Sequence, residues 1–141
     1  MSQGVWTIEF HAECEKWADG LVQRDKEALL AAISVLRDVG PALGRPLVDT
    51  VVASRHANMK ELRPGSTGRT EIRVLFAFDK ARTAVLLVGG DKSIGWKGWY
   101  ATNIPIADEL LDAHQRSLDE RATRARPSSR GGRQRKGGKR S

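Results

Sequence analysis

The chain has 141 residues, which is enough for one domain with a single hydrophobic core, and its formal net charge is +7. The charge is unevenly placed: nine of the 24 Lys and Arg residues fall in residues 121–141, which contain no acid. The first 120 residues carry 15 basic and 17 acidic groups, so net charge alone does not indicate a nucleic-acid-binding domain. The more informative segment is 54–100, which has nine bases and four acids.

Several functional classes are disfavoured by composition. Cys14 is the single cysteine, so no internal disulfide can form and a reducing compartment is expected. No apolar run approaches the roughly 18 residues that span a bilayer, and the N-terminus lacks the order of a signal peptide. His, Cys and carboxylates do not recur at metal-ligand spacing, and no phosphate-binding glycine motif is present. We therefore expect a cytoplasmic protein with no membrane segment, no metal and no cofactor.

The N-terminal half reads as a strand followed by helix. Residues 5–10 alternate between apolar and polar side chains, as a half-buried strand does. A short helix is plausible over 11–18, and the clearest helix of the chain runs over 21–39 before Gly40-Pro41 ends it. Dense Gly and Pro predict a loop over 40–46, and residues 47–54 have an extended pattern.

The stretch 59–100 is organised as a β-meander. Extended segments are predicted at 59–63, 69–78 and 83–88, separated by turn-forming Gly, Pro, Ser and Asp. In the middle segment one face carries Ile72, Val74, Phe76 and Phe78, and the other carries Glu71, Arg73, Leu75 and Ala77.

The C-terminal part reads as a loop, a helix and a tail. A flexible loop is expected over 89–95, then a helix over 104–120, with Pro105 in its first turn. Residues 121–141 contain no apolar residue larger than Ala, which predicts a disordered basic tail outside a domain of residues 1–120.

The order of these elements predicts an α+β fold, with helices on one face of a small, mostly antiparallel sheet. The other face is expected to stay partly open, so that its polar side chains can meet a ligand.

The meander and its flanks resemble toxins of the RelE/HigB type from bacterial toxin–antitoxin modules, in the phage-derived branch. The resemblance covers roughly residues 5–120 and depends on the order and spacing of short motifs rather than on any one of them. These motifs are Gly44-Arg45-Pro46-Leu47-Val48, Ser54-Arg55-His56, Met59-Lys60-Glu61-Leu62-Arg63, Arg73-Val74-Leu75-Phe76 and Gly89-Gly90-Asp91-Lys92.

The resemblance implies a ribosome-dependent mRNA endoribonuclease that acts in the ribosomal A site and is neutralised by a small antitoxin, of the helix-turn-helix DNA-binding type. It places the family's central-strand arginine at Arg73, its basic residue after the glycine loop at Lys92, and its aromatic near the last helix at Tyr100. Of the family's paired lysines on the first meander strand, Lys60 is present and Glu61 stands beside it. A sister branch resembling ParE has the same fold and poisons DNA gyrase, so a noncatalytic gyrase-inhibiting or antitoxin-binding module is the alternative.

Metal-free RNA cleavage by the 2′-OH needs a base, an acid and cations for the crowded phosphorane. Arg73, Arg63 and Lys92 are candidates for the cations, and His56, Glu61 and Tyr100 for the groups that move protons. The structural alternatives are an ion pair of Arg73 or Arg63 with Glu61 or Glu71, and a surface or capping role for His56.

RNA binding is assigned to aromatic and basic side chains around these residues. Trp96, Lys97 and Trp99 alternate aromatic and basic groups on which bases could stack, although both tryptophans could instead hold the last helix on the sheet. Arg55, Lys60 and Arg69 are the remaining RNA-binding candidates. The basic tail either holds phosphates nonspecifically or keeps the protein soluble.

Overall fold

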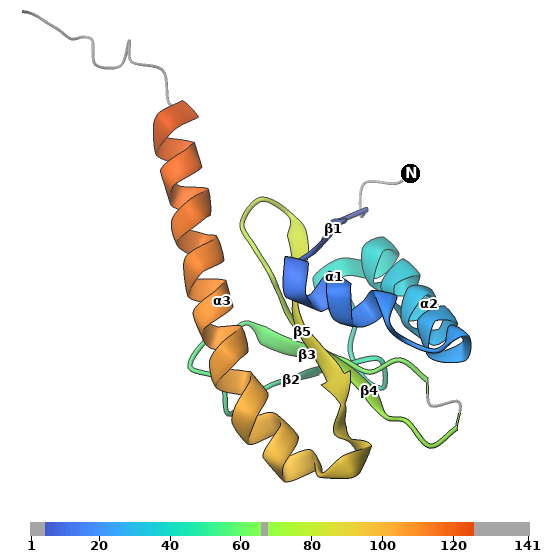
Figure 1. Cartoon of the computed structure of the whole chain (residues 1–141). Helices are drawn as coiled ribbons and strands as arrows, with labels where there is room; N and C mark the ends of the chain where they lie inside the picture. The colour runs from blue at the N-terminus through green and yellow to red at the C-terminus, as the bar shows by residue number, and fades with distance from the viewer. Residues whose placement is uncertain (1–4, 66–67, 126–141) are drawn as a thin grey trace, which may run out of the picture. The chain divides into compact units, whose positions relative to one another are not determined.

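A central β-sheet organises the computed structural model, which describes residues 5–65 and 68–125 (Figure 1). Within these residues the sheet has five strands in the order β1-β5-β4-β3-β2. All neighbours pair antiparallel except β1 and β5, which are parallel at one edge. The strands are β1 (Thr7–Phe10), β2 (Val48–Thr50), β3 (Met59–Leu62), β4 (Ile72–Phe78) and β5 (Thr83–Asp91). The predicted α+β class and the mostly antiparallel sheet are confirmed.

Two of the helix ends have a clear local cause. The His11 side chain accepts a hydrogen bond from the backbone N–H of Glu13 and caps α1 (Ala12–Asp19). Gly40, with φ of 73°, ends α2 (Gln23–Val39) in a conformation that only glycine adopts freely. Short 3-10 turns follow as η1 (Gly40–Ala42) and η2 (Lys92–Ile94), and α3 (Trp96–Ala125) closes the described chain.

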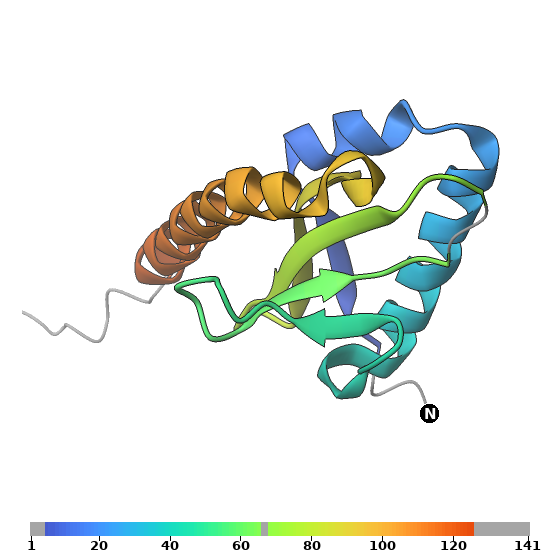
Figure 2. The same cartoon turned by 90° about the horizontal axis from the view of Figure 1, so that it is seen from below.

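Helices cover both faces of the sheet, so the prediction of helices on one face was wrong (Figure 2). On one face α1 and α2 pack on Val74, Phe76 and Leu86. On the other face Ile104, Ala107 and Leu111 of α3 pack on Leu75, Ala77 and Leu87. The physical reason is the middle strand itself, because Leu75 and Ala77 make its second face as apolar as the first. The predicted assignment of β4 side chains to two faces is confirmed.

The helix α3 begins at Trp96, not near residue 104 as predicted. Pro105 therefore lies inside the helix rather than in its first turn. Proline has no N–H, so the carbonyl of Ala101 does not receive the usual helical hydrogen bond from residue 105. The helix continues through Ala125, past the predicted start of the tail at residue 121, and the rest of that tail lies outside the described residues.

Two adjacent glycines at the end of β5 admit one tryptophan from each side of the sheet. A Cβ atom added to Gly89 would lie 2.2 Å from the ring of Trp17 in α1, and one added to Gly90 would lie 2.1 Å from Nε1 of Trp99 in α3. The predicted flexible loop over 89–95 is therefore wrong in its first part, where Gly89 and Gly90 belong to a packed strand.

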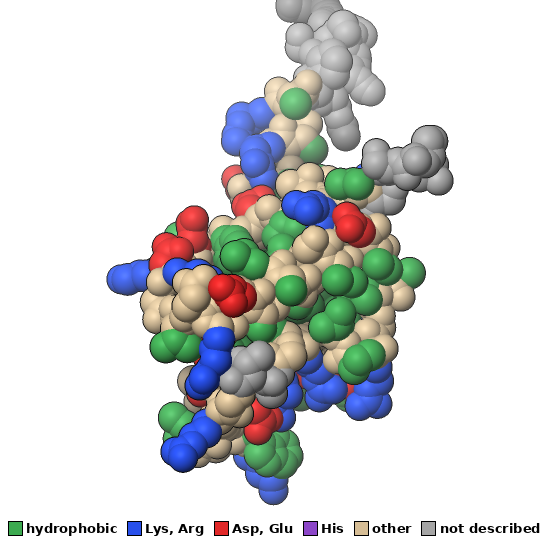
Figure 3. Space-filling model, turned by 90° about the vertical axis from the view of Figure 1, so that its right-hand side faces the viewer, with side chains coloured by type: hydrophobic (Ala, Val, Ile, Leu, Met, Phe, Trp, Pro, Cys, Tyr) green, Lys and Arg blue, Asp and Glu red, His purple; other side chains and the backbone are tan. Residues whose placement is uncertain are grey.

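The chain divides into two compact units, residues 1–111 and 112–141. The first holds the sheet, α1, α2 and the start of α3, and the described part of the second is the remainder of α3. Figure 3 views the side on which α2 lies, and α2 exposes the apolar residues Leu30, Val35 and Val39. Among the described residues no helix is both long and apolar enough to cross a membrane.

Candidate functional site

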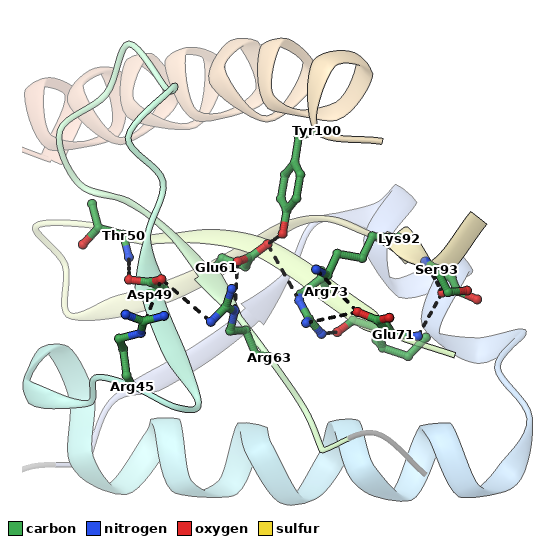
Figure 4. A network of polar contacts seen from close by, with 12 residues as sticks. Arg45, Asp49, Thr50, Glu61, Arg63, Glu71, Arg73, Lys92, Ser93 and Tyr100 are labelled. Atoms are coloured by element: carbon green, nitrogen blue, oxygen red, sulfur yellow. Dashed lines mark hydrogen bonds and ion pairs between the residues drawn. The ribbon is translucent and has the colours of Figure 1, made fainter. Parts of the chain in front are cut away.

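A row of alternating cations and carboxylates crosses the sheet face on which α3 packs (Figure 4). We call it the charged network; its members are Arg45, Asp49, Glu61, Arg63, Glu71, Arg73, Lys92 and Tyr100. Three of these residues lie in β2, β3 and β4, three in the segments that flank those strands, one in η2 and one in α3, so that only folding brings them together.

Strand register explains the middle of the network. β3 pairs with β4 so that Glu61 lies opposite Leu75, which is two residues from Arg73, and residues two apart along a strand share a face. Glu61 and Arg73 therefore lie on the same sheet face. Arg63 directly follows β3, and its ion pair with Glu61 brings a second cation to the same carboxylate.

Glu61 is the buried centre of the network, with 6% of its side chain exposed. Nε of Arg63 donates to its Oε1 at 3.2 Å, and the hydroxyl of Tyr100 donates to its Oε2. Nε of Arg73 lies 4.0 Å from the same Oε2, which is an ion pair but too long for a hydrogen bond. The carboxylate therefore joins β3, β4 and α3 around one charge.

Arg73 lies beside Glu61 with 11% of its side chain exposed. Its Nη1 donates to the carbonyl of Ile72 at 2.8 Å, and its Nη2 lies 3.7 Å from Oε1 of Glu71. Its buried Nε has no hydrogen-bond partner among the described residues. The guanidinium thus has an unused donor in a site where it is otherwise held firmly.

Glu71 bridges Arg73 to the last member of the network. Nζ of Lys92 lies 3.4 Å from the same Oε1 that contacts Arg73. Glu71 is 45% exposed, whereas Arg73 and Lys92 are 11% and 17% exposed. A half-exposed carboxylate thus pairs with two largely buried cations.

At the other end, Asp49 of β2 extends the row. Its Oδ2 lies 3.8 Å from Nη1 of Arg63 and 3.7 Å from Nε of Arg45, which is exposed. The sequence analysis missed Asp49 as a site residue. Its signal was a single acid within an otherwise apolar, β-branched segment.

Tyr100 keeps its proton at neutral pH. Burial, the hydrogen bond to Glu61 and the charge of Glu61 raise the pKa of Tyr100 to about 12, although Arg73 acts in the opposite direction. The phenol is therefore a neutral donor whose hydrogen points at Glu61.

Two tryptophans flank Tyr100 and play different parts. The partly buried ring of Trp99 packs against the core, and its centre lies 5.1 Å from that of the Tyr100 ring, which it meets edge-on, so Trp99 holds α3 on the sheet. The ring centre of Trp96 lies 6.3 Å from that of Tyr100, and Trp96 is 55% exposed. Nζ of Lys97 lies 5.6 Å from the ring centre of Trp96. Trp99 thus has the structural role of holding the last helix on the sheet, whereas Trp96 has the exposed ring surface that base stacking requires. Both lie in the first turns of α3, ahead of the predicted start of that helix.

Two further candidates, Arg55 for RNA binding and His56 for proton transfer, are not among the residues of the charged network. Both belong to a loop held by Asp108 of α3, which accepts hydrogen bonds from the Ser54 hydroxyl and, at 3.3 Å, from the Arg55 backbone N–H. The backbone N–H of His56 donates to Oγ of Ser54 at 2.9 Å. Sequence reasoning missed Asp108, although a carboxylate within the apolar stripe of a helix was a usable signal.

Lys60 and Arg69 are also separated from Arg73. Lys60 lies opposite Phe76, on the sheet face that packs against α1 and α2, because side chains alternate along a strand. Arg69 is exposed in the segment before β4. Neither residue adds to the cations around Glu61.

Comparisons with known proteins identify the family of the chain. Residues 16–112 match the family described as "Phage derived protein Gp49-like (DUF891)". The chain is 47% identical over 126 residues to "Putative toxin HigB2" of Mycobacterium tuberculosis (strain ATCC 25618 / H37Rv), covering 89% of this chain and 62% of that protein. It is 52% identical over 97 residues to "Putative toxin HigB3" of the same organism, covering 69% of this chain and 82% of that protein.

A solved structure shares the fold. A mutant of the E. coli toxin RelE in the free state superposes with a TM-score of 0.50 at 10% identity, covering 65% of this chain and 88% of that one. At this identity the likeness concerns the fold alone. The chain spans less than two thirds of the length of the HigB2 relative, so that protein's whole activity is not carried over by similarity. By sequence and by fold, the chain belongs to the phage-derived Gp49-like family and groups with the HigB toxins of the RelE-like fold.

Proposed function

We propose that this chain is the toxin of a toxin–antitoxin module and that it cleaves mRNA on the ribosome. The observation that carries the proposal is the group formed by Tyr100, Glu61 and Arg73, in which a phenol, a carboxylate and a guanidinium meet on one sheet face. Arg63 and Lys92 flank this group within the same network.

The orientation of the phenol supports a role for Tyr100 and Glu61 at the attacking 2′-hydroxyl. Because the Tyr100 proton points at Glu61, the lone pairs of its oxygen face away and can accept a proton from the substrate. As the 2′-oxygen attacks the phosphorus, its proton passes to Tyr100 while the phenolic proton passes to Glu61. A tyrosinate is not needed, which agrees with a pKa of about 12.

Cations complete the reaction at the phosphate. Arg73 and Arg63 stabilise the negative charge of the phosphorane, since guanidinium groups stay charged and hydrogen-bond to phosphate oxygens. Lys92 is the one ammonium of the network and can give its proton to the departing 5′-oxygen, which an arginine cannot do at neutral pH. The products are a 2′,3′-cyclic phosphate and a 5′-hydroxyl.

The balance of charges supports dependence on the ribosome. The charged network holds four cations and three carboxylates, so its net attraction for an RNA phosphate is small when the protein is alone. A ribosome that holds the mRNA strand against the site would fix the position of the strand and raise its local concentration, which the weak attraction of the network does not do. Exposed Arg55, Arg69 and Lys97 could contact ribosomal or messenger RNA around the site.

The same ion pairing supports a second candidate, a noncatalytic module of the gyrase-inhibiting kind. If the pairs are purely structural, Arg73 and Glu61 hold β3 to β4 and have no substrate. In either case we propose a small antitoxin as partner, of the helix-turn-helix type, encoded beside this chain.

The test is expression in a bacterial host with a translated reporter mRNA, followed by mapping of new RNA 5′ ends. We expect cuts within translated codons, and a loss of about 100-fold or more in Arg73→Ala, as for removal of one electrostatic donor. Arg37→Ala is the matched control, because Arg37 is an exposed arginine of α2. Arg73→Lys is a second variant that keeps the positive charge beside Glu61. Circular dichroism shows whether each variant is folded. Growth arrest with DNA damage and intact mRNA would support the gyrase reading instead.

A further inference from the structure

A second feature lies beside Tyr100. A cavity of about 240 Å³ is lined by Ala53, Tyr100, Ala101, Ile104, Pro105 and Asp108. Sites for drug-sized ligands usually measure about 300–1,000 Å³, so this cavity suits a single small ring system. We propose that it binds one nucleobase of the RNA, with a preference for bases that carry an amino group. The inference rests on the proposed function, because it takes the strand bound at Arg73 as the source of the base.

The position of Tyr100 connects the cavity to the charged network. Tyr100 belongs to both, since its hydroxyl contacts Glu61 and its side chain lines the cavity. A ligand that spans the two has an anion at one end and a small ring at the other, as a nucleotide does. Trp96 lies one helical turn before Tyr100, and Ile104 lies one turn after it. The bases on either side of a phosphate bound near Tyr100 would therefore each have a side chain to pack against.

The walls of the cavity fit a flat apolar face. Ala53 and Ala101 are small and leave a slot, and the buried side chain of Ile104 forms an apolar base. The loop wall is preformed, because Ser54 and the Arg55 N–H are tied to Asp108. The loop also closes on itself where the N–H of Val51 donates to the carbonyl of Met59 at 3.0 Å. No large rearrangement is therefore needed for a ring to enter.

The polar groups of the cavity are acceptors. Asp108 is buried, and its two oxygens offer about four acceptor positions, of which Ser54 and Arg55 take two. The carbonyl of Ala101 lacks its helical donor because residue 105 is proline. Adenine, cytosine and guanine present exocyclic amino donors, whereas uracil has a single ring N–H. The cavity should therefore discriminate against uracil.

The experiment is a methyl NMR titration of the full chain with AMP, CMP, GMP, UMP and ribose 5-phosphate. We expect saturable shifts of the Ile104 and Ala101 methyl signals with AMP, CMP and GMP, weaker shifts with UMP, and none with ribose 5-phosphate. Ala101→Leu fills the slot with a side chain that favours helix, and it should abolish the Ile104 shifts. Ala113→Leu makes the same change at another exposed position of α3 and should leave them unchanged.

The outcomes separate the inference from the proposed function. Equal shifts with ribose 5-phosphate, no saturation at millimolar nucleotide, or unchanged binding in Ala101→Leu would each overturn the nucleobase site. Equal binding of UMP would overturn the role of the acceptors. The reporter experiment tests cleavage independently. If cleavage depends on Arg73 but the cavity binds no base, the proposed function stands and this inference is wrong. If the site is correct, Ala101→Leu also removes any bias against uracil beside the cuts.

Discussion

The hydroxyl of Tyr100 donates a hydrogen bond to Oε2 of Glu61, across 39 positions of sequence and between a helix and a strand. This single contact connects the start of α3 to the centre of the charged network. It fixes which way the phenolic proton points, and therefore which side of the oxygen is available to a substrate.

The first prediction concerns the ionisation of Tyr100, which is the only tyrosine in the chain. Absorbance at the tyrosinate band of the native protein should titrate near pH 12, above the usual 10.0. Glu61→Gln removes the negative charge and weakens the hydrogen bond, so the midpoint should fall toward the ordinary value. A midpoint that does not respond to Glu61→Gln would show that the pair does not exist in solution.

The same shift predicts a dependence of stability on pH. The folded state holds the Tyr100 proton more tightly than the unfolded chain does, because its pKa is raised. This contribution to stability is fully present below pH 10.0 and is lost as the pH rises through about 12. Tyr100→Phe should remove this component of the alkaline loss in urea unfolding curves. An identical pH profile for Tyr100→Phe would contradict the assignment.

A prediction about affinity follows from the exposed carboxylate of Glu71. Glu71→Gln should tighten binding of a single-stranded 2′-O-methyl RNA, which cannot be cleaved, because Arg73 and Lys92 lose an internal competitor for phosphate. The expected gain is roughly two- to fivefold, since a partly exposed ion pair contributes about 0.2–1 kcal/mol. Fluorescence anisotropy measures it, with Glu9→Gln as control, because this exposed residue of β1 lies at the sheet edge far from the network. Weaker binding in Glu71→Gln than in Glu9→Gln would mean that Glu71 orients the cations instead of competing.

A pair of glycines tests how α3 is positioned. Gly90→Ala places a methyl group 2.1 Å from Nε1 of Trp99, so the start of α3 and Tyr100 must shift. We expect a loss of roughly 1–3 kcal/mol in stability, as for overpacked cores, together with a loss of cleavage. Gly98→Ala is the matched substitution within α3, where a Cβ meets nothing within 4 Å. It should stabilise the helix by about 0.5–1 kcal/mol and retain cleavage, and equal effects of the two changes would refute the role of Gly90.

A last prediction separates the loop of Ser54 from the charged network. Ser54→Ala removes a donor to the buried Asp108 and should cost roughly 1–3 kcal/mol of folding stability. The Tyr100 titration should not change, because its hydroxyl is held by Glu61. Chemical denaturation and the tyrosinate absorbance of the same sample check both parts, and a shifted Tyr100 midpoint would show that the two groups are coupled.

Local patterns were sufficient for much of the fold. The alternation in β4, the helical spacing and Gly40 stop of α2, and the turn between β4 and β5 each depend on near neighbours, and all three were predicted correctly. The predicted catalytic site comprised Arg73, Arg63, Lys92, Glu61, Tyr100 and His56. The structure joins the first five in the charged network and places His56 in the loop of Ser54.

Tertiary structure alone decided the rest, because it depends on which faces meet. The sequence could not show that Leu75 and Ala77 would take a helix on the second face, since a short apolar row is compatible with packing or with a ligand. Nor could it show that Gly89 and Gly90 make room for Trp17 and Trp99 instead of forming a loop, because the rings come from helices distant in the chain. The ion pairs of the charged network also could not be predicted from the sequence. Their charges come from four separate segments of the chain, and which cation meets which carboxylate depends on the register of the strands.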